Sequence, residues 1–333
     1  MVSKKYMLLA LFLPLLISGC TIPFIGPTFN SNTPEGTGVV IKDFGPDIQG
    51  DINSGEKVTF ALRVKNTGSV TAEKGFAELI GLDYVWKAAG LRQSNLGELF
   101  PNENNCAYDI RNINLLPEDN EAGTTGEETV CTWTYTAPTV SPGIAITSTP
   151  RVRFYYTYHS TTIKTITMLS REELINLQNQ GKGLPVESYT ATKSPISLEI
   201  ASASPVKIYG NQAEFPIIIT IKNVGGGTVC YKESFNCKKP GGISENDNWN
   251  WFMLRINLPE GLTLDAASCA GDEKIYLVGS SPQTLSCKII ADVSKQVGIS
   301  QKNIELAATY GYAIDKTISL NVVPSNMPGS SKK

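Results

Sequence analysis

The sequence predicts an all-β protein made of two tandem antiparallel β-sandwich domains joined by a short helical linker. Apolar and polar residues alternate with a period of two in many short segments, for example 58–65, 152–158 and 215–222. Such alternation is typical of strands with one buried and one solvated face. The chain also contains 29 glycines and 19 prolines, and many short strands punctuated by turn residues favour antiparallel sandwiches.

A set of similar segments recurs in the same order in the two halves, which indicates a tandem duplication. Asn66 and Asn223 stand in the contexts VKNTG and IKNVG, and CAYD at Cys106 resembles CAGD at Cys269. The predicted domains and connections are 38–168 for the first sandwich, 169–195 for the linker, 196–323 for the second sandwich and 324–333 for a disordered tail.

Residues 1–19 predict a lipoprotein signal peptide. Two lysines precede an apolar run, residues 6–17, that is too short to cross a bilayer as a helix, which takes about 20 residues. Its length suits a secretion signal. The sequence Ile-Ser-Gly-Cys at 17–20 resembles the lipobox of prokaryotic lipoproteins, which implies a diacylglyceryl group on Cys20 and cleavage just before it. An ordinary signal peptide with an incidental cysteine is the alternative.

Residues 20–37 predict a flexible tether behind the lipidated cysteine, since they are rich in Pro, Gly, Ser, Thr and Asn. Two acyl chains suffice for stable anchoring where one does not. We therefore expect the protein on the extracytoplasmic face of the cell membrane, held there through Cys20.

The other six cysteines predict three disulfides, because an even number of cysteines outside the cytoplasm favours pairing. The repeat makes Cys106–Cys131 and Cys269–Cys287 equivalent bridges, and Cys230–Cys237 then closes a short loop found only in the second half. Free buried thiols or a metal cluster are the alternatives, although the spacings match no zinc pattern.

Two segments have helical signals. Ser170 with Glu173 forms a capping-box pattern that predicts a helix over 171–180, read as a connector between the halves. A less regular pattern predicts a second helix over 83–93.

The segment 56–72, with the pattern VxFxLxVKNTG, resembles immunoglobulin-like domains of the CARDB and archaeal surface-layer-associated type, and 214–228 is a looser match. The resemblance implies that both sandwiches are immunoglobulin-like. Such modules are extracytoplasmic and are used in adhesion, envelope assembly and surface presentation. They have no shared catalytic residues to carry over to this chain.

Composition and motifs argue against several kinds of chemistry. The formal net charge is −2, so a nucleic-acid partner is not expected. The single histidine, His159, is expected in an exposed hairpin turn, and the SxxK patterns at Ser54 and Ser204 are expected in turns. We predict no enzymatic activity, cofactor or metal. A calcium loop among residues 43–51, which contain Asp43, Asp47 and Asp51, is the alternative for the metal.

The segment before Phe252 is the candidate partner surface. Trp249 and Trp251 are expected to share one strand face beside amides and acids, and such aromatic plates can stack on sugars or anchor a partner. A core position is the alternative. The predicted function is a non-enzymatic surface lipoprotein that binds an unknown protein or surface glycan, in adhesion or envelope structure. The alternatives are an accessory subunit of a pilus, secretion or transport machine, a carbohydrate-binding module and a hydrolase.

Overall fold

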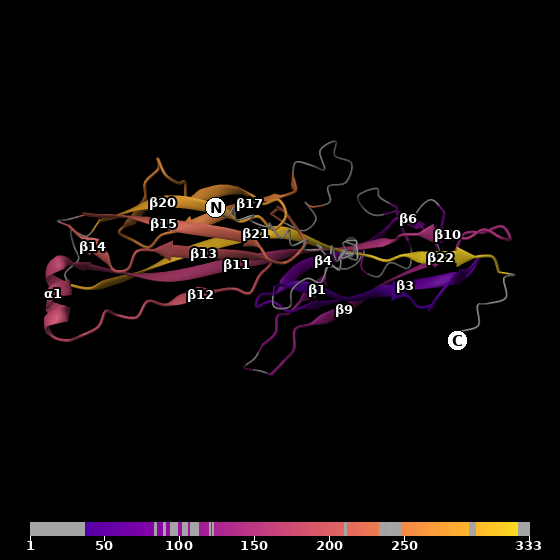
Figure 1. The fold of residues 1–333 in the computed structure, drawn as a ribbon, viewed down its shortest axis with the longest axis horizontal. Coiled ribbons are helices and arrows are strands. Elements are labelled where there is room, and N and C mark those ends of the chain that lie inside the picture. Colours follow the sequence, from indigo (N-terminus) through magenta and orange to yellow (C-terminus); the bar gives the residue numbers. More distant parts are fainter. Residues whose placement is uncertain are drawn as a thin grey trace, which may run out of the picture. The chain divides into compact units, whose positions relative to one another are not determined.

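The structure is a computed structural model. It describes residues 37–325 except 83–84, 89–90, 94–98, 102–105, 107–112, 120, 122, 210–211, 233–236, 238–247 and 293–297. The predicted signal peptide, Cys20 and nearly all of the tether lie outside the described residues, as does the tail from residue 326. The described part consists mostly of β-strands with one short helix (Figure 1), so the all-β class is confirmed.

The strands up to the helix are β1 (Val39–Pro46), β2 (Ile52–Asn53), β3 (Lys57–Asn66), β4 (Ala72–Ile80), β5 (Lys87–Ala88), β6 (Leu91–Gln93), β7 (Leu99–Pro101), β8 (Ile113–Leu115), β9 (Glu128–Thr136), β10 (Ile146–Ser148) and β11 (Arg151–Ser170). After the helix α1 (Arg171–Asn179) come β12 (Tyr189–Ala191), β13 (Ile196–Ser202), β14 (Val206–Ile208), β15 (Gln212–Asn223), β16 (Thr228–Tyr231), β17 (Trp251–Asn257), β18 (Leu262–Leu264), β19 (Asp272–Tyr276), β20 (Gln283–Asp292), β21 (Ser300–Thr317) and β22 (Leu320–Val323).

Two four-stranded sheets have corresponding strand orders, β1-β3-β9-β5 and β13-β15-β20-β18. In each sheet the first strand pairs antiparallel with the strand that ends at the Asn-x-Gly turn, so Val39 lies opposite Asn66 and Ile196 lies opposite Asn223. This correspondence supports the duplication, and it makes Val39 equivalent to Ile196 and Asn66 equivalent to Asn223.

A third sheet has the order β19-β17-β21-β11-β4-β8 and contains strands from both halves. Its two longest strands, β11 and β21, pair antiparallel from Arg151 opposite Thr317 to Met168 opposite Ser300, and they run side by side in Figure 1. The inward side chains of β11 include Val152, Phe154, Tyr156 and Tyr158, all fully buried, as the alternation predicts. On the other face Tyr155 and Thr157 are buried as well, so the solvated face predicted for this segment is wrong at these two positions.

The hairpin predicted around His159 is wrong. Residues 158–164 continue β11 as extended strand, because β21 pairs with them without a break. The helix predicted over 83–93 is also wrong, since Lys87–Ala88 and Leu91–Gln93 are strands.

The strands of the two predicted domains pair with one another. β22, at the end of the second predicted domain, pairs parallel with β2 and antiparallel with β10, both from the first. One hydrophobic core contains Phe60 and Trp133 as well as Phe215 and Ile289. The described residues belong to a single compact unit, and the boundaries 38–168 and 196–323 stay predictions.

The predicted connector helix is present as α1. The Ser170 side chain accepts a hydrogen bond from the backbone N–H of Glu173, 3.2 Å away. That bond satisfies one of the N–H groups that a helix start leaves without a partner.

The two Asn-x-Gly turns are held by equivalent tyrosines of β11 and β21. Tyr158 Oη accepts a hydrogen bond from the N–H of Val70 at 3.2 Å, and Tyr312 Oη accepts one from the N–H of Gly227 at 2.9 Å. Glycine in a tight turn often supplies a positive φ, which other residues rarely adopt. Gly68 is instead required by close approach, because a Cβ there would lie 2.0 Å from Tyr158 Oη.

Candidate interaction surface

The three residues of the predicted partner surface have different environments. Phe252 is fully buried, with its ring centroid 5.6 Å from that of Tyr310. Trp249 lies before β17 and forms an isolated bridge with Cys230, whereas Trp251 begins β17. Asn250, between them, has φ 65°. This left-handed residue interrupts the strand alternation, so the single strand face predicted for the two tryptophans is not formed.

Trp251 belongs to a group that we call the aromatic platform: Tyr231, Trp251, Lys274 and Tyr276. The rings of Tyr231 and Trp251 are stacked, with centroids 4.1 Å apart and planes at 16°. Lys274 Nζ lies 4.0 Å from the centroid of the Trp251 ring and 4.8 Å from that of Tyr276. Tyr276 lies opposite Trp251 in the β17–β19 pairing, so neighbouring strands present both rings on one face.

The platform is open to solvent on the β19 side. The Tyr276 side chain is 56% exposed, and Val278, just past the end of β19, is 70% exposed. Cation–π contacts at exposed sites contribute about 0.5–1 kcal/mol each. These contacts hold Lys274 against the rings, which leaves a preformed surface of aromatic, apolar and cationic groups.

Trp249 packs instead against a satellite cluster, a second apolar cluster formed by Phe76, Tyr155, Cys230, Cys237 and Ala313. Its members come from β4, β11, β16, β21 and the Cys230–Cys237 loop. Trp249 is therefore partly buried, which is closer to the alternative of a core position than to the predicted partner surface. The cluster that it packs against is separate from the main core.

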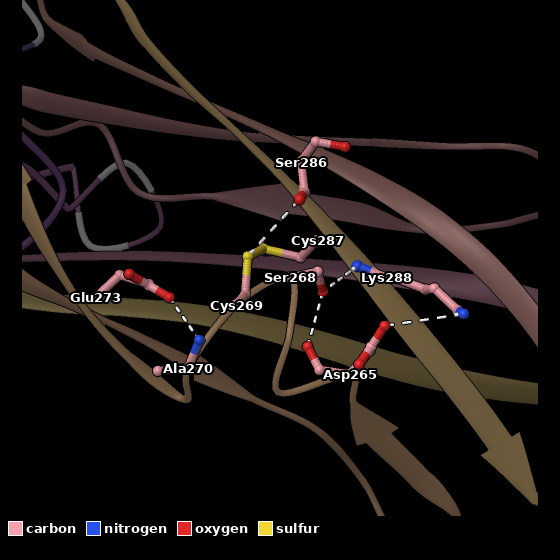
Figure 2. The surroundings of a disulfide bond; sticks show 8 residues. All are labelled: Asp265, Ser268, Cys269, Ala270, Glu273, Ser286, Cys287 and Lys288. Atoms are coloured by element: carbon pink, nitrogen blue, oxygen red, sulfur yellow. Dashed lines mark hydrogen bonds and ion pairs between the residues drawn. A yellow bond between two sulfur atoms is a disulfide. The ribbon is translucent and has the colours of Figure 1, made fainter.

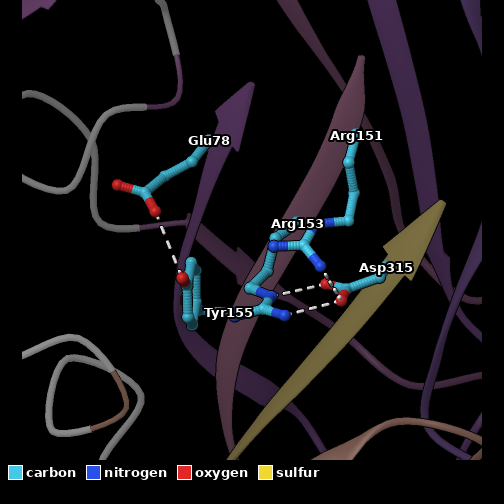
Figure 3. A network of polar contacts seen from close by, with 5 residues as sticks. All are labelled: Glu78, Arg151, Arg153, Tyr155 and Asp315. Carbon is cyan, nitrogen blue, oxygen red and sulfur yellow. Dashed lines mark hydrogen bonds and ion pairs between the residues drawn. The ribbon is translucent and has the colours of Figure 1, made fainter. Parts of the chain in front are cut away.

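A polar network borders the satellite cluster (Figure 3). The Arg153 guanidinium donates two hydrogen bonds to Asp315, from Nε to Oδ1 at 2.5 Å and from Nη2 to Oδ2 at 2.7 Å. The Arg153 guanidinium carbon also lies 5.5 Å from the centroid of the Trp249 ring. Tyr155 Oη donates a hydrogen bond to Glu78 at 3.1 Å. The network thus ties β11 to β21 on one side and to β4 on the other.

The environment shifts the pKa values in this network. Hydrogen bonding to Asp315 raises the pKa of Arg153 above its ordinary value, and burial raises the pKa of Tyr155. Arg153 therefore stays charged and Tyr155 stays protonated under all physiological conditions, which suits a structural clamp and provides no group poised to exchange protons.

The predicted disulfide pairing is confirmed. Cys106–Cys131, Cys230–Cys237 and Cys269–Cys287 are bonded, with Cα–Cα distances of 5.4, 5.3 and 5.3 Å. Around Cys269 (Figure 2), the Ser268 hydroxyl donates to the carbonyl of Asp265 at 2.8 Å and accepts from the N–H of Lys288 at 2.9 Å. These bonds hold the loop before β19 against β20, so the bridge lies in an ordered turn.

His159 lies in the middle of β11, not in a turn. Its Nδ1 is 2.9 Å from Thr309 Oγ1, and its Nε2 is 3.9 Å from Glu73. The adjacent Ser160 hydroxyl donates to the carbonyl of Ile196 and lies 2.7 Å from Tyr310 Oη. Because successive side chains of a strand point to opposite faces, His159 and Ser160 do not form a catalytic pair.

The serines of the two SxxK patterns have structural partners. Ser54 Oγ accepts a hydrogen bond from the N–H of Val140 at 2.9 Å, and Ser204 Oγ donates one to Glu187 at 2.5 Å. Asp47, from the alternative calcium loop, accepts a hydrogen bond from the N–H of Thr59 at 3.0 Å, so it orders a turn.

Within the described residues, no three His, Cys, Asp or Glu side chains gather where they could hold a metal ion. No helix in this part of the chain is long and apolar enough to cross a membrane.

Sequence reasoning missed three of the four platform residues, Tyr231, Lys274 and Tyr276. The alternation in 272–276 marks a strand with an exposed Tyr and Lys. The pairing that places these side chains beside Trp251 is a long-range feature with no local signal.

No protein-family model matches the chain, and no curated protein is similar to it. Among solved structures, it is similar at 9% identity and a TM-score of 0.20 to the Escherichia coli alpha-2-macroglobulin activated by porcine elastase, over 87% of this chain and 33% of that one. It thus spans about a third of that protein's length.

Two further similarities are to surface proteins. The collagen-binding domain of the Erysipelothrix rhusiopathiae surface protein RspB matches at 7% identity and a TM-score of 0.13, over 88% of this chain and 94% of that one. The CupB6 tip adhesin from Pseudomonas aeruginosa matches at 8% identity and a TM-score of 0.16, over 87% and 99%. Similarities this slight carry no argument about function.

Proposed function

We propose that the protein is a non-enzymatic lipoprotein, anchored through Cys20 on the extracytoplasmic face of the membrane. In this proposal its tandem immunoglobulin-like sandwiches present the aromatic platform to a protein or glycan partner, in adhesion or envelope structure. The observation that carries the proposal is the platform itself, in which Trp251 stacks on Tyr231 and contacts Lys274 beside the exposed Tyr276.

The chemistry of the platform suits recognition. Tyr and Trp are enriched among residues that contribute most to binding, because they bury a large area with few rotatable bonds. Lys274 adds a cation that is already positioned over two rings. The partner surface that fits is flat and partly apolar with an acidic group, or a sugar face that bears hydroxyl groups.

The disulfides and the signal sequence support the location. Disulfides persist in oxidising compartments and are rare in the cytosol, and the structure has three. Intact mass spectrometry of the protein from its native membrane tests the anchor. We expect a chain that starts at Cys20 and carries the mass of a diacylglyceryl group. A Cys20→Ser variant should be released from the membrane. Retention of that variant would contradict lipid anchoring through Cys20.

Binding of the full chain to isolated cell envelopes and to a glycan array tests the platform. The double variant Trp251→Ala/Tyr276→Ala should lose at least about tenfold in affinity, as expected for removal of two aromatic anchors. The matched control is Tyr189→Ala/Tyr209→Ala, which removes two tyrosines outside the platform that are 50% and 71% exposed.

The pattern of binding decides between partner classes. Loss of envelope binding in the platform variant alone, with an empty array, assigns a protein partner. Loss of a glycan signal in that variant assigns a surface glycan. Equal binding by the platform variant and the control would overturn the assignment of the platform.

A further inference from the structure

A hollow of about 250 Å³ in the first half is lined by three lysines, and nothing in the proposed function uses it. We call it the lysine hollow. Lys42 comes from β1, Lys65 from β3 and Lys193 from the segment between β12 and β13. The wall is completed by Asn66, Thr67, Glu118 and Thr125. The hollow is remote in sequence from the aromatic platform and shares no residue with it.

The wall is held in place by backbone hydrogen bonds. Lys193 and Ser69 are bonded in both directions, from the N–H of Lys193 to Ser69 Oγ at 2.8 Å and from the N–H of Ser69 to the carbonyl of Lys193 at 3.1 Å. Thr67 donates to the carbonyl of Gly38 from both its N–H and its hydroxyl, at 2.7 and 3.0 Å. The lysines therefore project from a fixed backbone.

The charge of the hollow is opposite in sign to that of the whole chain. Three ammonium groups and one carboxylate, that of Glu118, line it, while the chain has a formal net charge of −2. Lysines act as point-charge ligands for phosphate-type oxyanions, since an ammonium offers three donors and no acceptor. The Thr125 hydroxyl adds a neutral group that can also donate.

The second half provides an internal comparison. The pairing of Val39 with Asn66 corresponds to that of Ile196 with Asn223, so Lys65 is equivalent to Lys222. Glu199 lies opposite Thr220, whose equivalent in the first half is Arg63. Since Arg63 lies opposite Asp43, the equivalent of Glu199 is Asp43, and Lys42 has no equivalent. In the second half Lys222 Nζ and Glu199 Oε1 form an ion pair at 3.1 Å.

The first half has an additional lysine at this point of the strand pair, with no counterpart in the second half. Lys42 lies at a β-bulge, where the β1–β3 register shifts between Ile41 and Asp43. A bulge bends its strand and re-aims a side chain. The bulge thus adds Lys42 to the wall of the hollow, beside Lys65.

We propose that the lysine hollow binds a dianionic phosphate or sulfate group. The group is either a free oxyanion or a substituent of an acidic polymer. This proposal does not depend on the aromatic platform, on the lipid anchor or on the identity of the partner, so its failure would leave the proposed function untouched.

Calorimetric titration of the full chain in detergent with sodium phosphate and sodium sulfate tests the proposal, with sodium chloride at matched ionic strength as the reference. We expect saturable binding of phosphate and sulfate but not of chloride. Lys42→Glu should weaken binding about tenfold or more, because it replaces an attractive charge with a repulsive one. Lys193→Ala, at an exposed position, should also weaken binding.

Lys207→Glu makes the same change of charge at an exposed site on β14 and is the matched control. Thermal unfolding checks that each variant is folded. Binding of phosphate no tighter than chloride, or equal affinity in Lys42→Glu and Lys207→Glu, would overturn the proposal.

A second titration, with dextran sulfate against neutral dextran, distinguishes the sources. Tighter apparent binding of the sulfated polymer than of free sulfate, lost in Lys42→Glu, assigns a polymer-borne group. Equal affinity for the two assigns a free oxyanion. Binding of both dextrans alike would contradict recognition of a sulfate group.

Discussion

Two hydroxyl groups, those of Tyr158 and Tyr312, hold the two Asn-x-Gly turns from equivalent positions on β11 and β21. Tyr312 Oη also donates to Asn223 Oδ1 at 2.5 Å, and Tyr158 Oη donates to the carbonyl of Lys193 at 3.3 Å. Buried polar groups are costly unless they are paired. Each turn therefore depends on a tyrosine about 90 residues away in sequence.

Substitution of Gly68 with alanine should destabilise the fold by about 1–3 kcal/mol, the usual cost of overpacking a well-packed site. The added Cβ would lie 2.0 Å from Tyr158 Oη and 2.7 Å from the carbonyl oxygen of Lys193, which is backbone. Urea unfolding measures the loss. The control, Gly183→Ala, adds a Cβ with no atom within 4 Å and should change stability by less than about 0.5 kcal/mol. Equal losses in the two variants would contradict the close-approach argument.

The alternation of apolar and polar residues predicts which side chains are buried better than it predicts which residues they contact. The alternation in 152–158 correctly places Val152 and Tyr158 inside, because a period of two follows directly from strand geometry. The positions of Trp249 and Trp251 could not be predicted in this way. One residue, Asn250 with φ 65°, separates a tryptophan of the satellite cluster from one of the aromatic platform, and a left-handed asparagine has no firm signature in a single sequence.

At the scale of elements, the disulfide pairing could be predicted because the internal repeat makes Cys106–Cys131 and Cys269–Cys287 equivalent. The course of β11 could not be predicted from its own residues. Its 20 residues include a polar run, HSTT, which locally reads as a turn. That run stays extended because β21 pairs with every residue from 151 to 168, and a local pattern cannot reveal so distant a partner.

The three disulfides should stabilise the fold in the order of the loops that they close. Sequence separations are 25 for Cys106–Cys131, 18 for Cys269–Cys287 and 7 for Cys230–Cys237. The chain-entropy estimate gives about 3 kcal/mol for each larger bridge and about 2 kcal/mol for the short one. Paired cysteine-to-alanine variants, compared by urea unfolding, measure these losses. A larger loss from the shortest loop than from Cys106–Cys131 would show that loop closure does not dominate.

The inner face shared by β11 and β21 connects the two halves, and its tyrosines make stability sensitive to high pH. Burial raises the pKa of Tyr158 to about 12 and raises the pKa values of Tyr156, Tyr310 and Tyr312. An unfolded tyrosine loses its proton near pH 10, so above that pH the unfolded chain binds fewer protons than the folded one. The free energy of unfolding then falls as the pH rises.

We expect the loss to begin near pH 10, at up to about 1.4 kcal/mol per pH unit for each buried tyrosine, and to continue for Tyr158 until about pH 12. Urea unfolding at intervals between pH 8 and 12 measures the slope, and absorbance at 295 nm reports tyrosinate. Tyr158→Phe should flatten the slope, because one of the linked protons is removed. The same slope in this variant and the parent chain would contradict the assignment to Tyr158.

The whole described fold should unfold in one transition, because neither half has a complete set of strand partners alone. A chain cut after β11 would lose β21 and β22. Strands β2 and β10 would then lack their partner β22, and β11 would lack its partner β21 from Arg151 to Met168. Unpaired edges of this kind promote aggregation. We therefore expect one calorimetric peak for the full chain, with a calorimetric enthalpy equal to the van't Hoff enthalpy.

Residues 37–170 and 171–325, expressed separately, should be insoluble or unfolded. Two resolved peaks, or a soluble half with the circular dichroism of a folded sheet, would instead favour two independent sandwiches with the boundaries that the sequence predicts.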